Sequence, residues 1–250
     1  MDTRNKTNDI IKVCMLAGKV MLQSGAETYR VEDTMLRIAA SFDLESAQSY
    51  VTPTGIMFST NETEITHFVR IVKRSTDLHK VDMVNSISRK ITANELTLEA
   101  ASNELKRIET EVHTYTIAVQ IFAAALASGC FTIMFQGTWQ DFLPAFVIGG
   151  IGFSAMIYFH RIVEIQFFAE FLASLIIGLL AVLSIWLGIG YQLDKIIIGS
   201  VMPLVPGLLI TNAVRDLMAG HLVSGLSKGA EAFLTAFAIG AGIASVFSFL

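Results

Sequence analysis

The fold of this chain is decided by one stretch, IIIGSVMPLVPGLLITNAVRDLMAGHLVSGLSK at Ile196–Lys228. It begins like a membrane-spanning helix, but Pro203 and Pro206 interrupt it, and a glycine follows at once. Because proline lacks an amide donor and clashes with the carbonyl four residues earlier, we expect the carbonyls of Gly199 and Met202 to lose their helical partners. Inside lipid, such groups must be satisfied by protein or by a water-filled cavity. A proline-broken apolar segment is typical of a transporter's binding site, and a simple packing kink is the alternative.

On either side of residue 114 the composition of the chain differs sharply. Residues 1–114 hold 14 of the 18 Lys and Arg residues and 16 of the 22 Asp and Glu residues, and the remainder is mainly apolar. We therefore predict a soluble α+β domain with a helical stalk over residues 1–114 and a membrane domain over residues 115–250. The soluble part carries no basic block, so nucleic acid is not an expected partner.

Hydropathy predicts five membrane spans. They lie at Tyr115–Phe135, Phe142–Phe159, Ile165–Gly188, Ile196–Ile210 and Ala230–Phe249. The fourth is shorter than the ~20 residues that cross the hydrocarbon core, which indicates a broken or tilted element. The predicted fold class is an α-helical integral membrane protein with an N-terminal cytoplasmic α+β domain.

Basic residues in the loops predict the orientation. If the N-terminal domain is cytoplasmic, Arg161, Arg215 and Lys228 also lie inside, and only Lys195 lies outside. We therefore predict a multi-pass protein of the inner or plasma membrane with a cytoplasmic N-terminus. Because many secondary transporters pair two inverted halves, an odd number of spans favours another chain as the complementary half, with a homo-oligomer as the other possibility.

Periodicity and turn residues predict the elements of the soluble part. Helices are expected at Asp9–Gln23, Ala26–Ala40, Asp77–Lys90 and Glu95–Thr110, and short antiparallel strands within Tyr50–Thr60 and Ile65–Val72. Ser24 and Glu27 have the spacing of a capping box at the start of the second helix. The two cysteines, Cys14 and Cys130, fall in different parts and predict neither a disulfide nor a metal site.

Charged residues crowd the start of the second helix: Glu27, Arg30, Glu32 and Asp33. With His67 or His79 they could form a carboxylate–histidine site, and this is the basis of a hydrolase alternative. No nucleophile elbow, HExxH, P-loop or dinucleotide fingerprint is present, however. Acidic residues at a helix N-terminus are explained by the helix dipole. We therefore expect no enzyme activity, no metal and no cofactor.

Two motifs carry a family resemblance. LQSGAETYRVED at Leu22–Asp33 and PLVPGLLITNAVRDLMAGHLVSGLSKGAEA at Pro203–Ala232 resemble the threonine/serine exporter family, and more narrowly its N-terminal half, which also occurs as a separate subunit. The resemblance implies a membrane exporter of small metabolites. The family is associated with threonine and serine export, and its split branch with succinate export together with a small second membrane protein. Its N-terminal region has also been suggested to resemble a hydrolase.

The resemblance and the proline break together predict the site. Residues expected to contact the substrate are Met202, Pro203, Pro206, Gly207 and Asn212. The amides after Pro206 could meet a carboxylate, because helix N-termini favour anions. Residues expected to serve gating or proton coupling are Glu170, Arg215, Asp216 and His221, and the motif residues of the N-terminal domain are Gly25, Glu27, Arg30 and Glu32.

Several of these residues admit a plainer interpretation. Arg215 and Asp216 could form a gate, pair with each other or anchor a helix end at the interface. His221 could couple protons, since its ordinary pKa lies near neutrality, or be a surface histidine. Glu170 lies about one turn into the third span and could face a cavity or reach water.

Three functional classes compete. The leading hypothesis is one subunit of a secondary exporter of serine- or threonine-like amino acids, or of dicarboxylates such as succinate. The alternatives are a membrane-anchored sensor or scaffold that docks a partner at Glu27–Asp33, and a membrane-tethered hydrolase.

Overall fold

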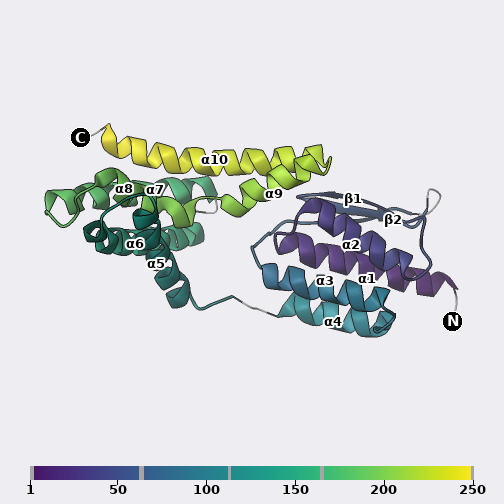
Figure 1. Cartoon of the computed structure of the whole chain (residues 1–250). Helices are drawn as coiled ribbons and strands as arrows, with labels where there is room; N and C mark the ends of the chain where they lie inside the picture. Colours follow the sequence, from purple (N-terminus) through teal and green to yellow (C-terminus); the bar gives the residue numbers. More distant parts are fainter. Residues whose placement is uncertain (1–2, 62–64, 112–113, 164–165, 249–250) are drawn as a thin grey trace. The chain divides into compact units, whose positions relative to one another are not determined.

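The computed structural model describes residues 3–61, 65–111, 114–163 and 166–248. It divides into two compact units, each described here by itself (Figure 1). The N-terminal unit comprises residues 1–114 and 210–229, and the apolar unit comprises residues 115–209 and 230–250. The predicted span ends at Ile165 and Phe249 lie outside the described residues.

The N-terminal unit is an α+β assembly with the predicted elements. Its helices are α1 (Thr3–Gln23), α2 (Thr28–Ala40), α3 (Leu78–Thr92) and α4 (Leu98–Thr110), and its strands are β1 (Gln48–Thr52), β2 (Gly55–Ser59) and β3 (His67–Arg70). The strands form one antiparallel sheet in the order β1-β2-β3. The sheet packs against α1 and α2, and these two helices also contact α3 (Figure 1). The predicted helices and strands of this part are confirmed.

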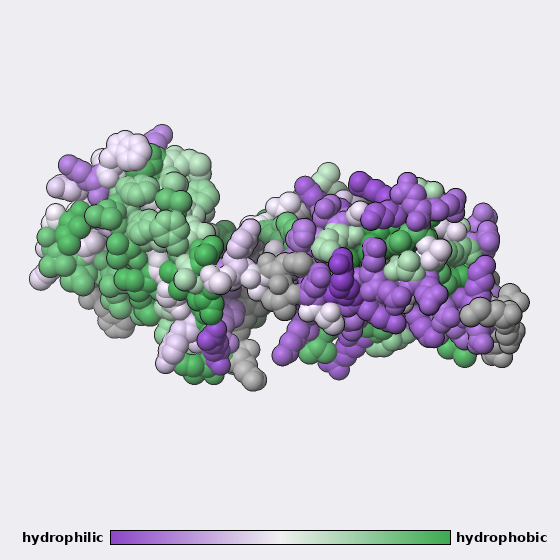
Figure 2. Space-filling view, turned by 90° about the horizontal axis from the view of Figure 1, so that it is seen from below, coloured by the Kyte–Doolittle hydropathy of each residue, from purple (hydrophilic) through white to green (hydrophobic). Residues whose placement is uncertain are grey.

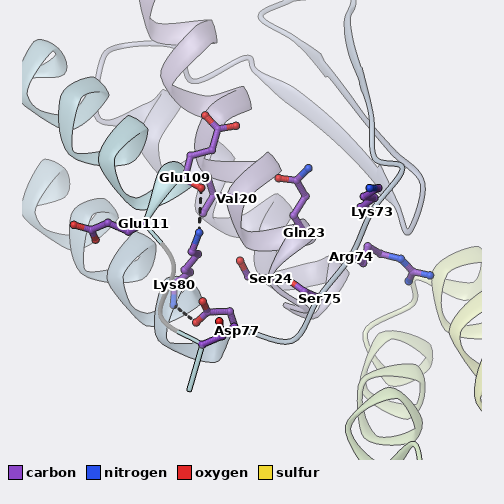
Figure 3. A pocket seen from close by; sticks show the side chains of 11 residues that line it. Val20, Gln23, Ser24, Lys73, Arg74, Ser75, Asp77, Lys80, Glu109 and Glu111 are labelled. Carbon is purple, nitrogen blue, oxygen red and sulfur yellow. Dashed lines mark hydrogen bonds between the residues drawn. The ribbon is translucent and has the colours of Figure 1, made fainter. Parts of the chain in front are cut away.

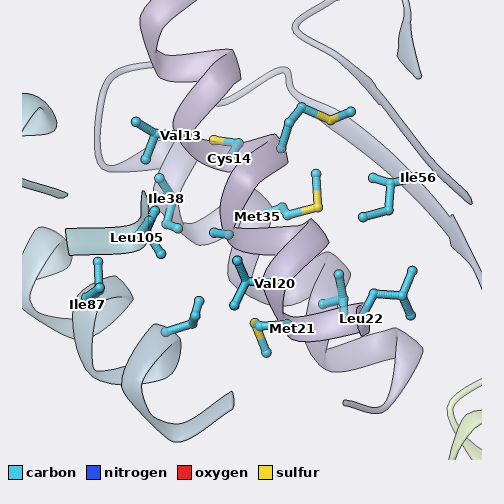
Figure 4. Close-up of a cluster of buried hydrophobic side chains, with 14 of the residues drawn as sticks. Val13, Cys14, Val20, Met21, Leu22, Met35, Ile38, Ile56, Ile87 and Leu105 are labelled. Atoms are coloured by element: carbon cyan, nitrogen blue, oxygen red, sulfur yellow. The ribbon is translucent and has the colours of Figure 1, made fainter. Parts of the chain in front are cut away.

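Alternation along the strands sets the core of the N-terminal unit. Val51 lies opposite Ile56, and both are buried together with Phe58. Figure 4 shows Ile56 beside core side chains of α1 and α2, Leu22 and Met35. Because successive side chains point to opposite faces, the neighbouring row is exposed. The thiol of Cys14 lies in the same core, and its burial raises its pKa to about 12, so it packs as a small apolar group. Neither cysteine forms a disulfide, as predicted.

The predicted capping box at the start of α2 is wrong. Glu27 occupies the N-cap position, but its side chain makes no capping hydrogen bond to the helix. Ser24 instead belongs to the turn that ends α1, in which the Ala26 amide donates to the Met21 carbonyl (3.1 Å) and the Gly25 amide to the Leu22 carbonyl (3.3 Å). This is a Schellman turn, and it requires the left-handed conformation that Gly25 adopts at φ +86°.

The apolar unit is built from long apolar helices. They are α5 (Ile117–Met134), α6 (Trp139–Ile162), α7 (Gln166–Trp186) and the greater part of α10 (Leu222–Phe247). Among the described residues, these four helices are long and apolar enough to cross a membrane, and a bent helix pair raises the number to five. Figure 2 shows their surface coloured mainly as hydrophobic, and that of the N-terminal unit mainly as hydrophilic. An unpaired apolar surface of this kind is what lipid covers.

The bent pair is the predicted proline break. Helix α8 (Leu193–Val201) runs into a 3₁₀ turn, η1 (Met202–Leu204), and α9 (Gly207–Met218) follows at an angle of 63°. The carbonyls of Gly199 and Met202 lose their i+4 partners to the two prolines, as predicted. They are not left free, however, because each accepts a shorter i+3 bond, from the amides of Met202 and Val205.

A buried aspartate fixes the other end of α8. Asp141, in the first turn of α6, is fully buried, and its Oδ1 accepts from the backbone amides of Tyr191 (2.7 Å) and Gln192 (3.2 Å). Its Oδ2 accepts from the hydroxyl (2.6 Å) and the amide (3.3 Å) of Thr138. One carboxylate therefore joins the start of α6 to the loop that precedes α8. The sequence reasoning did not single out this residue.

Candidate functional site

The two sequence motifs, 180 residues apart, meet inside the N-terminal unit. Residues 210–229, which comprise most of α9 and the first turns of α10, pack with residues 1–114 as one compact body. A second Schellman turn joins α9 to α10: the His221 amide donates to the Asp216 carbonyl (2.9 Å), and Gly220 adopts φ +87°. The turn sets the direction in which α10 departs and so fixes which of its residues face the start of α2.

Asp216 caps α2 from the other motif. Its side chain is fully buried, and Oδ1 accepts from the amides of Thr28 (2.9 Å) and Tyr29 (3.4 Å), the first two residues of α2. These amides have no partner within their own helix, and the positive end of the helix dipole favours a carboxylate there. Asp216 therefore performs the capping role that the sequence pattern assigned to Ser24.

Lys228 completes a buried ion pair with Asp216. The ammonium nitrogen lies 2.7 Å from Asp216 Oδ2, and the side chains are 4% and 0% exposed. The same ammonium donates to the Thr28 hydroxyl (3.2 Å) and to the Ala26 carbonyl (3.4 Å). Since a buried charge must be both paired and hydrogen-bonded, these contacts satisfy the ammonium and join α2, α9 and α10 at one point. Sequence reasoning used Lys228 only for topology, although it is one of four basic residues after residue 114.

Glu27 forms the second charged contact. Its carboxylate accepts from Arg215 (2.6 Å) and from Arg30 (3.2 Å), and its side chain is 7% exposed. Burial by itself raises the pKa of Glu27, but its backbone hydrogen bond and the two arginines outweigh that effect and hold the pKa below its ordinary value of 4.5. Arg215 therefore pairs with Glu27 and Asp216 with Lys228, and the two neighbours do not pair with each other.

Asn212 supplies a third contact between the motifs. Its side-chain amide donates to the Gly25 carbonyl at 2.9 Å, and the residue is buried. Asn212, Arg215 and Asp216 lie three, then one residue apart on α9, so they share one face of that helix. This face is applied to the segment Gly25–Tyr29.

His221 faces Glu32 beside a small cavity. The His221 Nδ1 lies 3.7 Å from Glu32 Oε1, which also accepts from the Val51 amide at 2.8 Å. Burial is the largest effect on Glu32 and raises its pKa above the ordinary value, against the Val51 amide and His221. The two side chains and Ser224 line a cavity of about 330 Å³. The hydroxyl of Ser224 donates to the Val51 carbonyl (3.2 Å), so Glu32 and Ser224 together occupy the free edge of β1.

The remaining predicted residues lie elsewhere. Met202, Pro203, Pro206 and Gly207 are together at the break between α8 and α9. Glu170 is buried in α7, at 4% exposure. His67 lies on β3 and His79 in the first turn of α3. Within the described ranges, no group of three His, Cys, Asp or Glu residues could hold a metal ion.

These features define a class of protein: a multi-helix membrane protein with a proline-broken helix pair whose second helix is bonded to a polar N-terminal unit. The family model of the threonine/serine exporters, ThrE, matches residues 12–250. The chain therefore belongs to this family, as its motifs predicted.

Several relatives cover nearly the whole chain. A "Probable succinate transporter subunit YjjP" of Klebsiella aerogenes is 24% identical over 96% of this chain and 93% of its own length, and the Escherichia coli protein of the same name is 25% identical. A "Probable threonine/serine exporter" of Mycobacterium tuberculosis is 24% identical over 92% of this chain but only 44% of its own length. No solved structure matches.

Proposed function

We propose that this chain is one subunit of a membrane exporter of small metabolites, either serine- and threonine-like amino acids or dicarboxylates such as succinate. The observation that carries the proposal is the family match over residues 12–250, together with similarity to YjjP proteins, named transporter subunits, over nearly their full length. The word subunit in those names supports a second membrane protein as partner.

In this proposal, substrate binds at the break formed by Met202, Pro203, Pro206 and Gly207. Two helix ends meet there at 63°, and irregular backbone at membrane depth is found where it lines a cavity or is buried in protein. The carbonyls at the break accept i+3 bonds, and the Gly207 amide donates to the Val205 carbonyl (2.8 Å). The amides that follow Gly207 in the first turn of α9 are therefore the groups better suited to a substrate carboxylate.

The gate in this proposal is the contact of α9 with the N-terminal unit. Asn212, Arg215 and Asp216 bond to Gly25, Glu27 and Thr28, so any movement of α9 must either carry these partners along or break the bonds. Glu170 and His221 are the candidate proton-coupling residues.

The proposal includes an orientation of the chain in the membrane. Arg215 and Lys228 belong to the unit that holds residues 1–114, which supports their placement on the side of the N-terminus. The excess of basic residues there favours the cytoplasm and hence a multi-pass protein of the inner or plasma membrane.

The test is efflux of labelled serine, threonine and succinate from vesicles that contain this chain, with and without a five-span partner. We expect efflux of one substrate class only when both are present, and its loss in Pro206→Ala. The matched control is Pro53→Ala, which changes a proline in the turn between β1 and β2, outside the apolar unit. Absence of efflux with verified insertion would contradict the proposal and favour the sensor or scaffold.

A further inference from the structure

Apolar side chains form a row on the outer face of the three-stranded sheet. Tyr50 lies opposite Met57, and Met57 lies opposite Phe68, so the row crosses β1, β2 and β3. The three residues are 51%, 45% and 58% exposed. An antiparallel sheet with one face on a core normally turns polar side chains to the other face. The core of the N-terminal unit therefore does not explain this row.

The row is flat because a glycine lies beside it. Gly55 is on the same strand and the same face as Met57, diagonal to Phe68. A Cβ at Gly55 would lie 2.8 Å from the Phe68 ring, so the ring rests against the sheet at the place where another residue would project. Such a surface suits a flat partner better than an inserted side chain.

Basic groups adjoin one end of the row. Arg70 is exposed and lies on the same face as Phe68, two residues further along β3. Lys73 and Arg74 are also exposed, and Figure 3 shows both on the loop that follows β3. Residues 65–76 contain no Asp or Glu. Neither Arg70 nor Lys73 forms an ion pair within the described part of the chain. The apolar row therefore has a positively charged end.

The chain itself keeps this sheet within reach of lipid. The polypeptide passes between the two units after residues 114, 209 and 229. The Ser224 hydroxyl, which donates to the Val51 carbonyl of β1, lies only five residues before the last of these positions, Gly229. A surface tethered in this way meets the bilayer around the apolar unit at high effective concentration, so even a weak attraction is sufficient.

We propose that the outer face of the sheet docks on the headgroup region of a bilayer that contains anionic lipid. Tyr50, Met57 and Phe68 enter the boundary between headgroups and acyl chains, and Arg70 and Lys73 meet the lipid phosphates. Aromatic rings are favoured at this depth, and binding there increases with apolar area and with the attraction of cations to anionic lipid. The proposal rests on the membrane location of the apolar unit and not on transport.

The area of the row argues against a second copy of the chain as the occupant. A stable interface buries roughly 800 Å² per partner. An aromatic side chain contributes about 150–250 Å² when it is fully buried, so three side chains that are already about half covered fall well short of that area. A tethered surface on a bilayer has no such requirement, because it does not lose the freedom of a separate molecule.

The test is quenching of a fluorophore on this face by phosphatidylcholine that is spin-labelled at its headgroup. The full chain with Cys130→Ser is placed in nanodiscs of phosphatidylcholine with or without phosphatidylglycerol, and Cys14 remains buried. The fluorophore is attached at Gln48→Cys, which is exposed on the same face and leaves the row intact. The reference is Glu99→Cys, exposed on α4, a helix that packs on α1 and α3. With phosphatidylglycerol, we expect quenching at position 48 to be clearly stronger than at position 99.

Two substitutions test the charges. Arg70→Gln is expected to lower the ratio of docked to undocked sheet by about fivefold, the effect of one basic residue at an anionic surface. Lys90→Gln, at an exposed lysine in the last turn of α3, should leave the ratio unchanged. Unchanged melting temperatures in the nanodiscs show that both variants remain folded.

Three results would overturn the inference. They are equal quenching at positions 48 and 99, quenching at position 48 that is the same without phosphatidylglycerol and in Arg70→Gln, and contact between the fluorophores of two chains in place of quenching by lipid. The last result would assign the face to a second copy. Because the measurement needs no substrate, it is independent of whether the vesicles show efflux.

Discussion

Two fully buried aspartates, one in each unit, both bind backbone amides from a distant part of the chain, but their negative charges are stabilised differently. Asp141 and Asp216 each accept two backbone amides through Oδ1 from a distant part of the chain. At Oδ2 they differ: Asp141 accepts only from Thr138, whereas Asp216 pairs with the ammonium of Lys228 at 2.7 Å. The first carboxylate is stabilised only by hydrogen bonds, from Thr138 and from the loop before α8. The second is balanced by a charge on another helix.

The difference bears on what can move. Hydrogen bonds from Thr138 and from residues 191–192 join elements of the apolar unit and leave no cation behind if they break. Separation of Asp216 from Lys228 would leave a buried anion and a buried cation each without its counter-ion, which is far more costly. The joint at Asp216 therefore holds α2, α9 and α10 in one arrangement unless all three rearrange together.

The largest effect is expected for Asp216→Ala. The change leaves the buried Lys228 ammonium and two amides of α2 without their acceptor, at a cost of about 3–5 kcal/mol. Thermal unfolding of the full chain in detergent measures the loss, and hydrogen exchange at the Thr28 and Tyr29 amides shows whether it is local.

The double variant Asp216→Ala with Lys228→Met is the control for this prediction. It removes the orphaned charge, so we expect it to be more stable than Asp216→Ala alone. Equal or lower stability of the double variant would show that the ion pair is not what makes the joint costly to break.

Asp141→Ala is expected to have the next largest effect. It removes the acceptor of three amides and a hydroxyl but orphans no charge, which costs about 1–3 kcal/mol. Faster exchange at the Tyr191 and Gln192 amides is the local measurement. Asp194→Ala, at an exposed pair with Lys195, provides the matched control and should be near neutral. A loss as large as that of Asp216→Ala would remove the distinction between the two aspartates.

Smaller effects are expected at the rim of the joint. Arg215→Gln removes the shorter of the two bonds to Glu27, but Arg215 itself is 55% exposed, so solvent screening limits the loss to about 1 kcal/mol. Arg30→Gln, at 3.2 Å, should cost less. Arg215→Gln should therefore melt at a lower temperature than Arg30→Gln. The reverse order would contradict the conclusion that Arg215 makes the stronger bond to Glu27.

The pH dependence of stability should separate Glu27 from Glu32. The lowered pKa of Glu27 gives stability that is present above 4.5 and is lost as the pH falls through its native pKa. Glu32 has a raised pKa, so its contribution is complete below 4.5 and is lost as the pH rises through its native value. The curve of melting temperature against pH should flatten below pH 4.5 for Glu27→Gln and above pH 4.5 for Glu32→Gln. If both variants flattened the same side of the curve, the opposite pKa shifts of Glu27 and Glu32 would be contradicted.

Much of the fold was predictable from sequence because the decisive signals are local. The helices and strands of residues 1–114 follow hydrophobic periodicity and turn residues, and the break follows from two prolines. The prediction of a capping box was wrong for a local reason too. Gly25 ends α1 in a left-handed turn, and Ser24 is part of that turn and does not cap α2. The pattern of a capping box does not distinguish these outcomes.

The sequence by itself determined the two compositions, the apolar spans, the proline break and the family. Only the tertiary structure decided that Asp216 caps α2, that Lys228 balances it and that Arg215 pairs with Glu27. The contacts of Asp216 with Thr28 and of Arg215 with Glu27 join residues 188 positions apart, and no periodicity or spacing encodes a contact of that range. Burial decides it: once α9 packs against the start of α2, each charge that leaves water must find a partner among the few groups present.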